Sequence, residues 1–159
     1  LLDSTFEGQS RAAIKEHEAG LTLIRDRFKD VPTAISIDPG YADELWVKDA
    51  RFEDISGPAV IISNEENART EINLEDIVCR HVPSFASFRE SGKKVEGTGE
   101  LYQVKKFTHG LTFDETGATT KIKTTYEAQA LKNPSSPHRG RANRPRPCFL
   151  PPARPCWNP

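Results

Sequence analysis

The chain has 159 residues, of which 36% are hydrophobic, and this size and composition fit one domain with a modest core. Its 22 basic and 23 acidic side chains leave a formal net charge of −1, so the overall charge favours no nucleic-acid partner. No apolar run is long enough to cross a bilayer, and no signal peptide is visible. We therefore expect neither a membrane nor a nucleic-acid partner.

A repeated pattern of short apolar segments is the main feature of the chain. Four segments end in anchor residues spaced 22, 24 and 27 positions apart: Phe6, Phe28, Phe52 and Cys79. A second apolar run follows each anchor and opens with an alanine: Ala13, Ala34, Ala59 and Ala86. A period in this range, built from segments without helical phase, is typical of a solenoid of stacked repeats.

The residues within each repeat indicate strands joined by turns. Apolar and polar residues alternate with a period of two, and turn formers such as Ser56-Gly57-Pro58 separate the two runs. Leu21–Ile24 indicates a third strand per repeat. Such repeats bury their inward side chains only by stacking at about 4.8 Å. The prediction is an all-β, right-handed parallel β-helix of about four to five coils spanning residues 1–127.

The pattern changes in the last third of the chain. It loosens over Ser91–Gly99 and recovers alternation in Leu101–Phe107, and Thr119–Tyr126 is typical of an edge or capping strand. Residues 128–159 contain no acidic residue and include eight of the 12 prolines, which predicts a disordered tail. This basic tail has only Phe149 and Trp157 as stacking groups, so a nucleic-acid site is not favoured.

One coil carries a resemblance to a known family. The run Trp46–Ala59 resembles a coil of the pectate-lyase-like β-helix superfamily. The order of segments resembles glycoside hydrolase family 28-related proteins, whose relatives include fungal exo-1,3-β-glucanases, and Pro151–Asn158 is similar to the linker between their two β-helical halves. The resemblance implies a secreted or periplasmic protein that hydrolyses a polysaccharide such as a β-glucan.

Stacked coils convert sequence spacing into columns of equivalent residues. One column, three positions before the anchors, comprises Asp3, Arg25, Asp49 and Asp76. Adjacent coils would place Asp49 and Asp76 about 5 Å apart at the backbone, near the roughly 5 to 5.5 Å carboxyl separation of retaining glycosidases. We predict these two aspartates as the catalytic pair, in the roles of acid and of nucleophile or base. The alternative is a solvated charge ladder with no catalytic role.

Four further residues are predicted to bind the polysaccharide: Trp46, Glu53, Arg80 and His81. The Trp46 indole suits stacking on a sugar ring, or it covers the core. Glu53 and Arg80 belong to a second column with Glu7 and Lys29. His81 is placed either to reach the Asp76 column or to serve as a hydrogen-bonded turn residue.

The cysteines and histidines show no metal-ligand spacing, so we expect no metal and no cofactor. Cys79 occupies an anchor position and is expected to be a small buried core residue. Two other functions stay open. One is a non-catalytic, carbohydrate-binding or scaffold half of a larger enzyme. The other is a tailspike-like adhesion fragment that self-associates through open β-helix ends.

Overall fold

The computed structural model describes residues 1–17, 20–38, 44–63, 71–113 and 115–132. These ranges form strands and no helix, which confirms the all-β prediction. The described residues therefore include no helix long and apolar enough to span a membrane. The strands are β1 (Thr5–Glu7), β2 (Ala12–Glu16), β3 (Gly20–Ile24), β4 (Arg27–Lys29), β5 (Thr33–Ile37), β6 (Glu44–Lys48), β7 (Arg51–Glu53), β8 (Pro58–Ile62), β9 (Glu71–Arg80), β10 (Ser84–Phe88), β11 (Lys94–Glu96), β12 (Leu101–Phe113) and β13 (Thr119–Ala130).

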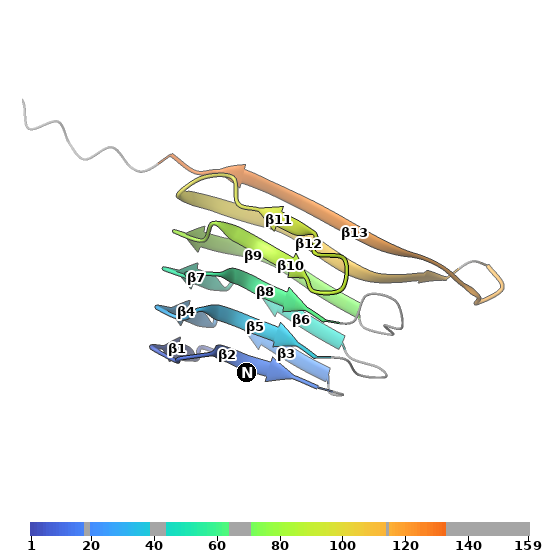
Figure 1. Ribbon diagram of the computed structural model, residues 1–159, viewed down its shortest axis with the longest axis horizontal. Coiled ribbons are helices and arrows are strands. Elements are labelled where there is room, and N and C mark those ends of the chain that lie inside the picture. Colours follow the sequence, from blue (N-terminus) through green and yellow to red (C-terminus); the bar gives the residue numbers. More distant parts are fainter. Residues whose placement is uncertain (18–19, 39–43, 64–70, 114, 133–159) are drawn as a thin grey trace, which may run out of the picture.

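The strands assemble into an eight-stranded sheet and a five-stranded sheet. The larger has the order β1-β4-β7-β9-β12-β13, with β3 and β6 joined to it through β9, and the smaller has the order β11-β10-β8-β5-β2. Strands of successive repeats lie one above another in both sheets (Figure 1). β3 confirms the third strand per repeat that Leu21–Ile24 predicts.

The anchors lie in one register, as their spacing predicts. Phe6 pairs with Phe28, Phe28 with Phe52, and Phe52 with Cys79, all between parallel strands. The Phe6 and Phe28 rings stack at 5.0 Å between centroids, and Phe28 meets Phe52 edge-on at 5.1 Å. Cys79 is fully buried, which confirms the core position expected for it.

The second apolar run departs from its predicted alignment in the fourth repeat. Ala86 pairs with Val60 rather than with Ala59, so Phe85 precedes it as an inward residue. The Phe85 ring lies 6.3 Å from that of Phe52. Because the Cys79 side chain is much smaller than phenylalanine, the Phe85 ring fills volume that a fourth anchor phenylalanine would have occupied.

Parallel pairing stops after β10. A short connection containing Gly92, with φ of 65°, returns the chain so that β11 pairs antiparallel with β10. β12 then runs antiparallel to β9, and β13 antiparallel to β12. Short connections permit only antiparallel neighbours, because parallel strands need a long crossover. β13 forms the edge of the sheet, as Thr119–Tyr126 predicts, and continues past Glu127 to Ala130, whereas residues 133–159 of the predicted tail lie outside the described residues.

Candidate functional site

The predicted catalytic aspartates occupy one corner of successive repeats. Asp49 follows β6, and Asp76 lies at the equivalent point within β9, where both side chains are exposed. Their backbones are left-handed, with φ of 55° and 54°, and so are those of Asp3 and Arg25 in the same column, with φ of 51° and 57°. The Asp49 N–H donates to the Glu75 carbonyl at 3.2 Å, so the ladder of hydrogen bonds continues through this corner.

The four members of this column have different partners. Arg25 donates to both carboxylate oxygens of Asp3, at 2.7 and 2.8 Å, and this hydrogen bonding holds the pKa of Asp3 below its ordinary value. Gln103 donates to Asp76 at 3.4 Å. Lys48 pairs with Glu75, so the residues that follow them, Asp49 and Asp76, are direct neighbours in the column. No basic residue lies between these two aspartates in the column. Two adjacent carboxylates therefore remain, as the repeat spacing predicts.

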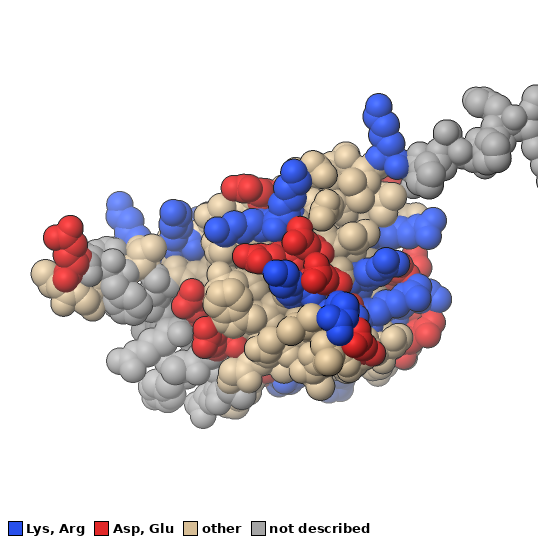
Figure 2. Space-filling view, turned by 180° about the vertical axis from the view of Figure 1, so that it is seen from behind, with Lys and Arg blue, Asp and Glu red and all other residues tan. Residues whose placement is uncertain are grey.

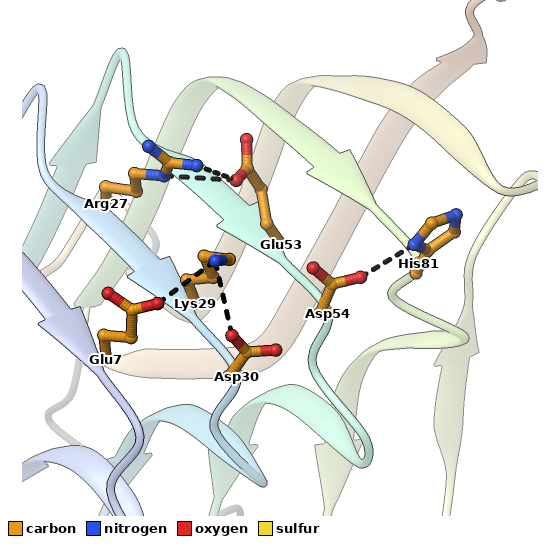
Figure 3. A network of polar contacts seen from close by, with 7 residues as sticks. All are labelled: Glu7, Arg27, Lys29, Asp30, Glu53, Asp54 and His81. Carbon is orange, nitrogen blue, oxygen red and sulfur yellow. Dashed lines mark hydrogen bonds and ion pairs between the residues drawn. The ribbon is translucent and has the colours of Figure 1, made fainter.

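The second predicted column carries a network of surface ion pairs (Figure 3). Lys29 donates to Glu7 at 3.1 Å, and its pKa is raised by Glu7 and by Asp30. Arg27 bonds to Glu53 through both Nε and Nη2. The predicted binding residue Glu53 is therefore already engaged by an arginine one repeat below it, which supports the charge-ladder alternative for this column.

His81 lies away from the Asp76 column. Its Nδ1 is 2.7 Å from Oδ1 of Asp54, and both residues have left-handed backbones, with φ of 52° and 55°. They belong to a second corner column that also contains Gly8 and Asp30, two positions after the anchors. The structure thus favours the hydrogen-bonded turn role for His81. Arg80, its neighbour, is exposed and pairs with Glu53 across parallel strands.

Trp46 projects from the outer face of the eight-stranded sheet. Its side chain is 43% exposed while Val47 is buried, so the strand alternation turns the indole outward. Trp46 pairs with Thr22 on one side and Asn73 on the other, and the column continues through Thr108 and Thr125. We call these five residues the Trp46 ladder. Figure 2 views the molecule from behind, where acidic and basic side chains interleave beside uncharged surface.

Two open hollows border the Trp46 ladder. One, of about 370 Å³, is lined by Trp46, Thr22, Lys48 and Glu75 among others. The other, of about 270 Å³, includes Asn73, Glu71, Thr108 and Lys123. Trp46 and Asn73 are paired neighbours, so the hollows lie along one line of the sheet.

A third hollow lies at the corner that carries Asp49. Asp49 lines a separate one of about 480 Å³, together with Arg25, Arg27 and the buried carboxylate of Asp26. Asp26 accepts a hydrogen bond from the Ser4 N–H at 2.6 Å. The predicted catalytic residue Asp49 and the aromatic side chain of Trp46 thus line two different hollows.

Sequence reasoning missed two carboxylates beside the Trp46 ladder. Trp46 Nε1 donates to Glu44 Oε1 at 2.6 Å, and Asn73 Nδ2 donates to Glu71 Oε1 at 3.2 Å. Glu44 and Glu71 pair with each other across β6 and β9. The alternation of the strand could have predicted them, because a residue two positions before an outward-facing tryptophan in a strand also faces outward.

Comparison of the chain with protein-family models, with curated proteins and with solved structures gave no match. Within the described ranges, no group of three or more His, Cys, Asp or Glu side chains is arranged to hold a metal ion.

Proposed function

We propose that the two sheets are faces of a right-handed parallel β-helix. Three observations support this fold: three strand segments per repeat, parallel register between equivalent strands, and left-handed corner residues that recur at the same two points. Right-handedness follows from the strong preference of parallel crossover connections for that hand. The antiparallel pair β12 and β13 then closes one end of the stack.

We infer that the Trp46 ladder binds a polysaccharide. The observation that carries this inference is the exposed indole of Trp46, whose orientation is set by its hydrogen bond to Glu44. An aromatic face pairs with the apolar face of a sugar ring, while amide and hydroxyl groups bond to sugar hydroxyls. Asn73, Thr22 and Thr108 supply such groups in the same column, which suits a linear ligand lying across successive strands.

Binding is tested by affinity electrophoresis on a panel of β-glucans, cellulose and chitin-derived polymers. The parent chain is expected to be retarded in at least one gel, and Trp46→Ala is expected to lose that retardation. Ile122→Ala is the matched control, since Ile122 is also an exposed large apolar residue but lies outside the ladder. Retardation that survives in Trp46→Ala would contradict the assigned surface.

A second candidate function is hydrolysis by Asp49 and Asp76. The observation that favours it is their position in adjacent repeats without an intervening base, which matches the two-carboxylate arrangement of glycosidases. A reducing-sugar assay on the bound polymer tests it, with Asp49→Asn and Asp76→Asn compared against the parent. Loss of product in both variants, with unchanged thermal unfolding, supports catalysis. Activity that persists in both would exclude this pair.

A further inference from the structure

The outer edge of β13 is a long strand edge without a partner in the described ranges. β12 and β13 end the stack of parallel strands, and β13 lies at the margin of the larger sheet (Figure 1). An edge strand presents a row of unpaired N–H and C=O groups, which is a template for pairing with another strand. β13 has 12 residues, more than most strands, and no proline interrupts its hydrogen-bonding groups. This edge can therefore accept an added strand.

The even-numbered residues of β13 direct their backbone groups to this outer edge. The Leu131 N–H, just past the strand, donates to the Leu101 carbonyl of β12 at 2.8 Å. Residues of an antiparallel ladder alternate between those that bond to the neighbouring strand and those that do not. The bulge in this part of the ladder inserts its extra residue into β12, so the count along β13 is unbroken. The N–H and C=O groups of Ile122, Thr124 and Tyr126 therefore point away from β12.

The side chains along β13 present charges of both signs on one face and apolar groups on the other. Lys121, Lys123 and Glu127 are exposed on the outer face of the sheet. Ile122 and Tyr126 alternate with them and so lie on the opposite face. Ile122 is 39% exposed although it is a large apolar residue, and Tyr126 is half-buried. An added strand would meet both the charged and the apolar side chains.

β13 is complementary to itself when two copies lie antiparallel about a two-fold axis at Thr124. Each residue then faces the one equally far from the axis in the other copy. Lys121 thus faces Glu127, and Ile122 faces Tyr126 on the opposite side of the sheet. Opposite charges, and an aromatic residue opposite a β-branched one, both stabilise a pair of strands. The outward backbone groups of the two copies also meet in hydrogen-bonding positions.

A shift of the axis by one residue weakens this complementarity. With the axis at Lys123, the two Lys123 side chains face each other, and like charges there destabilise the pair. With the axis at Thr125, a charge pair of Lys123 with Glu127 remains. Ile122 then faces the small Ala128 instead of an aromatic ring. The first register is therefore the one that satisfies both faces of the strand.

We propose that two copies of this chain associate edge to edge through β13, antiparallel and centred on Thr124. The two larger sheets then become one, and neither copy retains an open β13 edge. A two-fold contact uses the same surface in both copies, so it closes at a dimer rather than growing into a fibre. The inference stands apart from the proposed carbohydrate binding, because it rests on the strand edge and not on the Trp46 ladder.

The test reverses the facing charges in the full chain and measures the monomer–dimer equilibrium by analytical ultracentrifugation. The parent chain should dimerise. Lys121→Glu and Glu127→Lys, each alone, should raise the dissociation constant of the dimer about tenfold, because each turns two attractive pairs into repulsive ones. Equal amounts of the two variants, when mixed, should form a heterodimer as tight as the parent dimer, since every facing pair is then opposite in sign.

Lys123→Glu is the matched control, because it makes the same charge reversal where the facing residue is the neutral Thr125. It should raise the dissociation constant much less than Lys121→Glu does. Thermal unfolding of each variant separates a lost interface from a lost fold. Lys121 pairs with the neutral Thr112 in β12, so Lys121→Glu breaks no charge pair within the sheet and tests the interface by itself.

A parent chain that stays monomeric at every concentration overturns the proposal and leaves the edge to another occupant, whether residues 133–159 or a different protein. Dimers that survive Lys121→Glu unchanged overturn this interface, and so do two folded variants that stay monomeric when mixed. A larger effect of Lys123→Glu than of Lys121→Glu overturns the register centred on Thr124.

Discussion

Asp49 and Asp76 share a left-handed backbone at the same corner of adjacent repeats, with φ of 55° and 54°. Residues with a Cβ atom avoid this conformation, and aspartate and asparagine tolerate it better than most others. The aspartates of this column therefore satisfy a requirement of chain direction, whatever chemistry they perform. A catalytic role has to be demonstrated apart from this structural one.

Substitution at Asp49 separates the two roles. Asp49→Gly should keep or raise the free energy of unfolding, whereas Asp49→Val should lower it by about 1 to 2 kcal/mol, because glycine accepts the left-handed conformation and a β-branched residue does not. Asp49→Asn should stay within about 0.5 kcal/mol of the parent. Urea unfolding curves measure all three. Equal stability of the glycine and valine variants would show that the corner places no demand on the backbone.

Phe85 is predicted to be the most sensitive aromatic position of the fourth repeat. It is fully buried and contacts the rings of Phe52, Phe107 and Tyr126. Phe85→Ala should lower the free energy of unfolding by about 3 to 5 kcal/mol, through lost burial and the cavity left behind. Phe6→Ala is the matched control, because Phe6 is only partly buried at the other end of the ring stack. A loss at Phe6 as large as at Phe85 would contradict this packing.

Alkaline pH should destabilise the fold through buried thiol and phenol groups. Burial raises the pKa of the Cys79 thiol to about 12 and that of the Tyr126 phenol to about 12. In the unfolded chain these groups ionise near about 8.5 and 10 respectively. The folded state therefore holds more protons than the unfolded state above about pH 9, so the free energy of unfolding falls with rising pH until about pH 12. The buried Cys79 thiol contributes up to about 1.4 kcal/mol per pH unit, and the half-exposed Tyr126 phenol contributes less because solvent screens it.

The Cys79 contribution is measured from urea unfolding at a series of pH values, in a chain with Cys148→Ser and Cys156→Ser. Adding Cys79→Ala should make the decline between about pH 9 and 10 distinctly shallower, because over that interval the thiol of the unfolded chain is mostly ionised while its tyrosines have only begun to ionise. An identical slope with and without Cys79 would mean that the thiol does not change its pKa on folding.

The spacing of the anchors was enough to predict much of the register. Phe6, Phe28, Phe52 and Cys79 pair as their periodicity indicates, because a period-two strand cannot slip by one residue without exposing its buried face. The same spacing predicted the column of Asp49 and Asp76. Local pattern was sufficient where each repeat resembles the one before it.

Features that depend on compensation between repeats could not be predicted. The register of β10 turns the Phe85 ring inward, where it fills the space left by the small Cys79 side chain. The size of that space depends on how the two sheets pack together. The reversal to antiparallel strands follows from the short connection at Gly92, where the sequence shows only a loosened repeat. The contact of His81 with Asp54, by contrast, was predictable, because counting two positions from the paired anchors places both residues in one corner column.

The most direct test of the Trp46 ladder as a sugar-binding surface is fluorine NMR of the Trp157→Phe chain labelled with 5-fluorotryptophan. The single resonance then belongs to Trp46, whose ring is exposed on the outer face of β6. Binding of a sugar ring against the indole should shift this resonance in a saturable way as an oligosaccharide of the polymer that retards the parent chain is added, and Asn73→Ala should weaken the binding. A resonance that stays unchanged while the oligosaccharide binds elsewhere on the chain would contradict the assignment of this surface.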